Sequence, residues 1–308
     1  MAASIRHQAS EVRESRGEPL RKTLISFLKC VLVITILCLS LLELRAPTLV
    51  CSVPTNMANV IFFAAAACLA RSVVADVQPV YALDIATPLS EFDARCLKMC
   101  RYSTVFLRAY SPFVSGGFEA SVCGSVKNAQ RAGFGIELYM IPLAPNLQDG
   151  ALQFDSLYNG LKGCQVLVKR IWLVVTSPRE WLYNPPQSVG FINKVINRAK
   201  QYGIDVGIYT NEDDWGQITN GFMGFTTTPL LWYWKVNGPG PMGETPMNFQ
   251  DFRPFASWKG PTVKQFGQRV FVCGHMTNRD TYFANIRQTF ANTASNGNVS
   301  YVGYDTFQ

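Results

Sequence analysis

Short apolar runs and longer amphipathic stretches alternate along this chain from Val80 onward. A short apolar run bounded by turn residues is typical of a buried β-strand. The sequence predicts eight such strands, at Val80–Ile85, Thr104–Ala109, Gly135–Ile141, Ile171–Val175, Val206–Thr210, Pro229–Trp234, Val263–Phe266 and Val270–Cys273.

Between the first five predicted strands, apolar residues recur at helical spacing. The clearest helix extends from Ser188 to Tyr202, and Gly203 then stands where a helix usually stops. Phe118–Arg131 follows the same pattern, whereas loops rich in glycine and proline dominate after Pro229. Strands with helices between them predict an α/β fold, here a parallel barrel of eight strands. A doubly wound open sheet is the alternative, but no glycine-rich fingerprint follows the first strand to favour it.

The first 75 residues form a separate region. A 19-residue apolar run at 24–42 follows five Lys/Arg residues and is close to the length that spans a bilayer. A second run at 60–70 ends in Ser-Val-Val-Ala75, which suits a signal-peptidase site before Asp76. The chain therefore divides into an extension (1–56), a signal-peptide-like segment (57–75) and a domain (76–308).

Two interpretations of this region remain open. Met57 is the working start of a secreted protein, or 24–42 is a signal anchor that holds the domain at a membrane. Both place the domain outside the cytosol.

The charge and the numbers of cysteines and histidines limit which partners, disulfides and metal sites we expect. The net charge is +7, but the domain after Ala75 holds 20 Lys/Arg and 17 Asp/Glu, which is too balanced to indicate nucleic acid as a partner. Five of the nine cysteines follow residue 75, so at least one thiol stays unpaired within the domain, and either Cys96 or Cys100 could be a small buried side chain. With two histidines in the whole chain we expect no metal site, and no sequence feature indicates a cofactor.

Six short motifs carry a resemblance to a known family. In chain order they are Tyr-Ala-Leu-Asp84, Phe-Leu-Arg-Ala-Tyr110, Tyr-Met-Ile-Pro142, Arg-Ile-Trp-Leu173, Gly-Ile-Tyr-Thr-Asn211 and Pro-Leu-Leu-Trp232. From about Val80 to Phe283 the chain resembles the nematode and protist branch of glycoside hydrolase family 25, the lysozyme-like muramidases. The resemblance implies an irregular TIM-like (β/α) barrel with eight mostly parallel strands and few helices in the last third.

The resemblance also exposes a departure from the family. The family's fourth strand reads Ile-Trp-Leu-Asp-x-Glu, and these two acids carry out hydrolysis. The matching positions here hold Val174 and Thr176, which share one face of the strand but supply neither a proton nor a negative charge near neutral pH. A late-strand motif departs as well, because Asn278 stands where the family has an acid.

Two acids remain as candidates for chemistry. Asp84 ends the first strand, where the family places a substrate-contacting Asp, and Glu137 lies on the third strand, where related sequences often carry an acid. The alternatives are a surface or capping Asp84 and an exposed or ion-paired Glu137. Aromatic residues at the strand ends either line a saccharide groove or fill the top of the barrel: Tyr110, Tyr139, Tyr209 and Trp232.

The leading hypothesis is a secreted, lysozyme-like pseudoenzyme of innate defence that binds bacterial cell-wall glycan (peptidoglycan) or a host glycan. The defence role comes from the family resemblance alone. One rival is an active glycosidase that uses Asp84 and Glu137. The other is a membrane-anchored, non-catalytic interaction protein held by 24–42.

Overall fold

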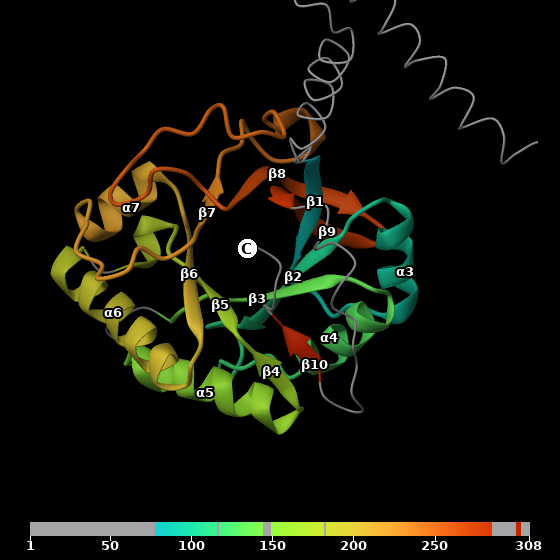
Figure 1. Ribbon diagram of the computed structural model, residues 1–308, viewed down its shortest axis with the longest axis horizontal. Helices are drawn as coiled ribbons and strands as arrows, with labels where there is room; N and C mark the ends of the chain where they lie inside the picture. The colour runs from blue at the N-terminus through green and yellow to red at the C-terminus, as the bar shows by residue number, and fades with distance from the viewer. Residues whose placement is uncertain (1–77, 116, 144–148, 182, 285–299, 303–308) are drawn as a thin grey trace, which may run out of the picture. The chain divides into compact units, whose positions relative to one another are not determined.

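The computed structural model describes residues 78–115, 117–143, 149–181, 183–284 and 300–302 (Figure 1). The predicted membrane segment at 24–42 and the signal-like segment at 57–75 lie outside the described residues. Within the described part, no helix has the length and apolar character needed to cross a membrane.

Eight strands close into a barrel in the order β1-β2-β3-β5-β6-β7-β8-β9 (Figure 1). Neighbours from β1 through β8 pair in parallel, whereas β9 lies antiparallel to both β8 and β1. A short parallel pair, β4 and β10, lies outside this sheet. The bounds are β1 Gln78–Ile85, β2 Thr104–Tyr110, β3 Gly135–Met140, β4 Val166–Val168, β5 Arg170–Val174, β6 Asp205–Thr210, β7 Leu231–Trp234, β8 Val263–Val272, β9 His275–Ala284 and β10 Ser300–Val302.

Helices cover the outside of the barrel and belong to its first two thirds (Figure 1). They are α3 Glu91–Met99, α4 Ser121–Arg131, α5 Gly150–Gly163, α6 Pro185–Gln201 and α7 Glu212–Thr219, with short 3-10 turns η2 Pro178–Glu180 and η3 Pro241–Gly243. After β7 the described chain forms loops, η3 and strands. The prediction of a TIM-like barrel with eight mostly parallel strands and few late helices is therefore confirmed.

The last two predicted strands were wrong in detail. Val263–Phe266 and all of Val270–Cys273 except Cys273 belong to one strand, β8, whose pairing with β9 shifts register on both sides of Gly267. In the sequence, residues 267–269 interrupt the apolar pattern and so suggest a break between two strands. In the structure they form an irregularity within one strand, and a glycine is typical of such a bulge. The eighth barrel strand is β9, which the pattern missed because its inward side chains include Asn278 and Asp280 rather than apolar residues.

Two apolar clusters hold the barrel together. The outer cluster packs the helices against the strands, with Phe154, Leu157 and Ile192 among its fully buried members. The inner cluster fills the barrel itself and is mainly aromatic: Ala82, Phe106, Tyr139, Trp172, Tyr209, Trp232, Val263 and Tyr282. The Trp232 ring centroid lies 4.3 Å from that of Phe106 and 4.7 Å from that of Tyr209. The barrel interior is a packed core rather than an open channel.

In the described part of the chain, two disulfides join elements that are distant in sequence. Cys123 in α4 bonds to Cys164 at the end of α5, and Cys96 in α3 bonds to Cys273 in the turn between β8 and β9. Cys100 is free, as the odd count required, and it is exposed rather than a buried apolar residue.

The inner cluster makes a specific demand on β6. A Cβ atom added to Gly207 would lie 2.4 Å from the Trp172 ring, which is too close for any side chain. We expect Gly207→Ala to lower the free energy of unfolding by about 1–3 kcal/mol, because it overpacks the core. Urea unfolding followed by fluorescence measures this change.

Gly190 provides the matched control, since it is exposed on α6 and a Cβ there would meet no atom within 4 Å. Gly190→Ala should raise stability by about 0.5–1 kcal/mol through helix propensity. Equal effects of the two substitutions would contradict the packing of Trp172 against β6.

Candidate functional site

The candidate site lies where the parallel strands end, the mouth of the barrel, as the strand direction requires. Asp84 is the next-to-last residue of β1, and it pairs with Asn278 on the neighbouring strand β9. The Asn278 side-chain amide donates to the Asp84 carboxylate at 2.8 Å, and the Tyr139 hydroxyl donates to the same carboxylate. Burial raises the pKa of Asp84 to about 6, although the donors Tyr139 and Asn278 and the Arg108 guanidinium lower it in part.

A second acid lies beside Asp84, and the sequence did not single it out. Asp280 pairs with Ala82, one step deeper in the barrel, and it is fully buried. Its carboxyl group accepts from the Trp232 indole nitrogen at 2.8 Å and from the Asp84 backbone N–H. Burial, followed by the charge of Asp84, raises the pKa of Asp280 well above its ordinary value. Asn278 stands where the family has an acid, and this chain carries an acid two residues later, at Asp280.

Val174 and Thr176 lie at the end of β5 as predicted. Val174 packs against the inner aromatic cluster, and the Thr176 hydroxyl donates to the carboxylate of Asp214. Asp214 also accepts from the Trp234 indole nitrogen at 3.1 Å and from the Ser177 backbone N–H. Burial raises the pKa of Asp214, while the hydrogen bonds from Thr176 and Trp234 lower it in part.

In the sequence, Asp214 has the pattern of a residue in the first turn of a helix and not that of a site residue. Asn211 is the N-cap of α7 and accepts from the Asp214 backbone N–H at 2.8 Å. An acid three residues after an N-cap is typical of a helix start, so the pattern marks a cap and not a site. Thr176 and Asp214 are 38 residues apart in sequence, so their hydrogen bond is visible only in the folded chain.

Glu137 faces the barrel interior but is not at the mouth. It lies two residues before Tyr139 on β3 and is fully buried. Arg170, the first residue of β5, donates to it at 3.2 Å, and the Trp172 indole nitrogen donates at 2.8 Å. A positive charge this close to a carboxyl group favours its charged form, the carboxylate. The proposed role of Glu137 as proton donor stays a prediction, and this ion pair does not favour it.

The four aromatic candidates do not form one groove. Tyr139, Tyr209 and Trp232 lie together in the inner cluster, whereas Tyr110 belongs to the outer cluster. All four are less than 9 % exposed, and the Tyr209 hydroxyl accepts from Gln265 at 2.9 Å. Their faces are occupied by protein, so saccharide stacking on them stays a prediction that would require the mouth to open.

An open pocket of about 220 Å³ lies beside the end of β5. It is mainly apolar, and its polar members include Glu180 from η2, which is exposed. Phe113, 84 % exposed, supplies an aromatic side chain to the pocket. The full lining is Phe113, Ile141, Pro142, Leu143, Val174, Thr176, Ser177, Glu180 and Trp181. Val174 and Thr176, at the family's two acid positions, therefore border the space that a ligand can enter.

Among the described residues, one group of sulfurs has the spacing of a metal site: Cys96, Cys100 and Cys273. Two of the three are joined in a disulfide and cannot act as thiolate ligands in this state.

Comparison with known proteins identifies the relatives of this chain. The family model described as "Lysozyme-like protein 1" matches residues 75–266. "Lysozyme-like protein 1" of Caenorhabditis elegans is 46% identical over 211 residues, which cover 68% of this chain and 71% of that protein. The "Probable GH family 25 lysozyme 2" of Dictyostelium discoideum is 31% identical over 62% of this chain and 85% of its own length.

Solved structures share the fold at low identity. A family GH25 lysozyme from Aspergillus fumigatus superposes with a TM-score of 0.52 at 16% identity, over 68% of this chain and 97% of that one. A lysozyme from Streptomyces coelicolor gives 0.51 at 17% identity, over 70% and 96%.

The raised pKa of Asp84 predicts a pH dependence of stability. The folded pKa of about 6 exceeds the ordinary value near 3.8, so the folded state holds this proton more tightly than the unfolded state. The stability contribution is present below about pH 4 and is lost as the pH rises through 6, by up to about 3 kcal/mol. Asp84→Asn should remove this loss, so the stability difference between variant and wild type should grow from pH 4 to pH 7.

Chemical denaturation at a series of pH values measures that difference. Asp205→Asn is the control, because Asp205 is exposed at the start of β6. A difference between Asp84→Asn and wild type that stays constant from pH 4 to pH 7 would contradict the shifted pKa.

Proposed function

Because this chain belongs to the lysozyme-like proteins of glycoside hydrolase family 25, we propose that it binds bacterial cell-wall glycan with little or no hydrolysis. The pocket beside β5 and the mouth of the barrel form the binding region. The observation that carries the proposal is the end of β5, where Val174 and Thr176 border the pocket.

The chemistry of glycoside cleavage explains why this observation matters. Cleavage generally requires one carboxylic acid to protonate the leaving oxygen and a second carboxylate on the other side of the bond. An isopropyl group and a hydroxyl do neither. The loss of general acid catalysis alone lowers the rate by about 10²–10⁴-fold. Glycan binding does not depend on either carboxylate, since the pocket offers Phe113 and several polar groups to a sugar.

The domain's disulfides support a location outside the cytosol. Cys96–Cys273 and Cys123–Cys164 would be reduced in a cytosolic compartment. We propose secretion and a role in innate defence, the latter from family membership alone. A signal-anchored protein with the domain outside the cytosol is the alternative for the region before Asp76.

A second candidate function rests on Asp214. Its carboxyl group reaches the Thr176 hydroxyl, and its raised pKa is a property that a proton donor needs. Under this alternative the protein is a slow muramidase in which Asp214 replaces the acid that strand β5 lacks. Asp214 meets the requirement for a proton donor better than the earlier candidate Glu137, which is bound to Arg170.

Binding is tested by retention on insoluble peptidoglycan. We expect Phe113→Ala to weaken binding about tenfold, which corresponds to about 1.4 kcal/mol, because it removes the exposed ring of the pocket. Phe92→Ala is the matched control, since Phe92 is 81 % exposed on α3 and does not line the pocket. Equal losses for both variants, or none for either, would sink the proposed binding region.

Hydrolysis is tested by the clearing of a peptidoglycan suspension. The wild-type protein should be slower than an active family 25 lysozyme by at least about 10²-fold. Val174→Asp with Thr176→Glu should restore clearing, and Asp214→Asn should be added so that the new glutamate does not face a second carboxylate.

The single variant Asp214→Asn separates the two candidate functions. It leaves glycan retention unchanged under both, and it abolishes residual clearing only if Asp214 is the proton donor. Clearing by the wild type at the rate of the active relative, unaffected by Asp214→Asn, would contradict both.

A further inference from the structure

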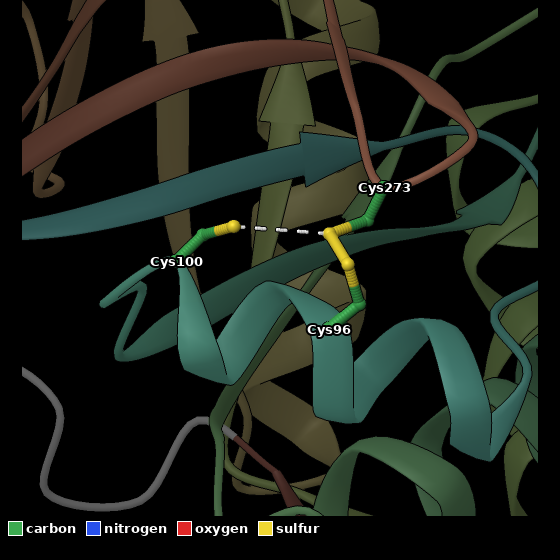
Figure 2. Close-up of side chains that lie close together, drawn as sticks. All are labelled: Cys96, Cys100 and Cys273. Atoms are coloured by element: carbon green, nitrogen blue, oxygen red, sulfur yellow. Dashed lines mark hydrogen bonds between the residues drawn. A yellow bond between two sulfur atoms is a disulfide. The ribbon is translucent and has the colours of Figure 1, made fainter.

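Three sulfur atoms meet between helix α3 and the turn that joins β8 to β9. Cys96 and Cys273 form a disulfide, and the sulfur of Cys100 lies 3.9 Å from that of Cys273 (Figure 2). Cys100 is exposed, so its thiol is accessible from solvent. A thiol in near contact with one sulfur of a disulfide is placed for exchange.

The local structure explains why both cysteines reach the same partner. Cys96 lies in α3 and Cys100 is the C-cap residue of that helix, so the two are four residues apart and lie on the same side of α3. Cys273 and Gly274 form the two-residue turn of the hairpin, and both have positive φ, 47° and 85°. Positive φ at both central residues is the geometry of a tight hairpin turn, which fixes the direction of the Cys273 side chain.

A second link holds the hairpin against α3 independently of sulfur. The His275 ring contacts the Asp93 carboxylate through Nε2 at 3.3 Å and the Thr87 hydroxyl through Nδ1 at 2.8 Å. The turn therefore keeps its place while a bond at Cys273 changes partner.

We propose that Cys100 is a thiol–disulfide exchange site that shares Cys273 with Cys96. The Cys100 thiolate attacks the Cys273 sulfur, a Cys100–Cys273 bond forms and the Cys96–Cys273 bond breaks. The electron pair leaves on the Cys96 sulfur, which takes up the proton that Cys100 released. One disulfide and one thiol are present before and after, so the step requires no oxidant or reductant.

The exchange preserves the link that matters to the mouth of the barrel. Strand β9 begins at His275, directly after the turn, and carries Asn278 and Asp280 to Asp84. Either bond ties the start of β9 to α3.

Tryptic mapping of the full-length protein tests the proposal directly. Trypsin cleaves after Arg95, Lys98 and Arg101, which places Cys96 and Cys100 on separate three-residue peptides. Cys273 lies on the peptide 270–279. The two linked products therefore differ in mass. The protein is held at pH 8, its free thiols are capped with N-ethylmaleimide, and the capped chain is digested and analysed without reduction.

We expect both linked peptides, with the minor one at no less than about a tenth of the total, because the two bonds join chemically similar partners. The Cys123–Cys164 pair is the internal control and should give one linked product. In Cys96→Ser, the Cys100–Cys273 peptide should account for nearly all of Cys273, whereas Cys100→Ser should retain only the Cys96–Cys273 product.

The proposal is overturned if the wild type yields the Cys96–Cys273 peptide alone after prolonged incubation at pH 8. Full capping of both Cys100 and Cys273 in a folded Cys96→Ser protein would overturn it as well. The wild-type map decides the matter even where the Cys96→Ser variant fails to fold.

Discussion

Keeping carboxyl groups inside a closed, aromatic barrel is the constraint on which the rest of this structure depends. A buried carboxylate without a partner is costly, and here tryptophan indole N–H groups supply partners to three acids. Trp172 donates to Glu137, Trp232 to Asp280 and Trp234 to Asp214. The same rings fill the barrel or line its mouth, so one residue type satisfies both packing and hydrogen bonding.

The hydrogen-bond donors to these acids differ in charge, and this difference affects the pKa of each acid. An indole is neutral and cannot cancel the cost of burying a negative charge, so the pKa values of Asp280 and Asp214 are raised. Glu137 has the Arg170 guanidinium in addition, which favours the carboxylate. Asp84 has two neutral donors and the charge of Arg108, which lower its pKa in part, yet burial raises the pKa to about 6. The mouth thus holds acids whose pKa values are raised by burial, and the Glu137–Arg170 ion pair lies deeper in the barrel.

The sequence predicted the parallel part of the barrel because those strands are apolar on both faces. It failed where polar side chains point inward: β9 carries Asn278 and Asp280 into the core, and no hydrophobic period marks it. In the candidate site, too, the sequence identified some residues and missed others. Asp84, Val174 and Thr176 were found because motifs around them resemble a family, whereas Asp214 has the pattern of a helix cap. Whether an acid at N3 of a helix also faces a barrel mouth is decided by tertiary structure.

The retained acids do not by themselves argue for catalysis. Asp84 joins three strands, since Asn278 from β9 and Tyr139 from β3 both donate to it. Burial raises the pKa of Asp280 well above its ordinary value, yet Asp280 is fully buried on the level of Ala82, beneath the Asp84 side chain and against Trp232. A proton donor must lie within hydrogen-bond reach of the oxygen it protonates. For Asp280 that reach would require Trp232 to leave the aromatic cluster, at the cost of the packing that closes the barrel. The acids of strands β1 and β9 are therefore explained by the architecture. Hydrolysis would have to take place at the end of β5, where Val174 and Thr176 stand and Asp214 from α7 accepts from the Thr176 hydroxyl.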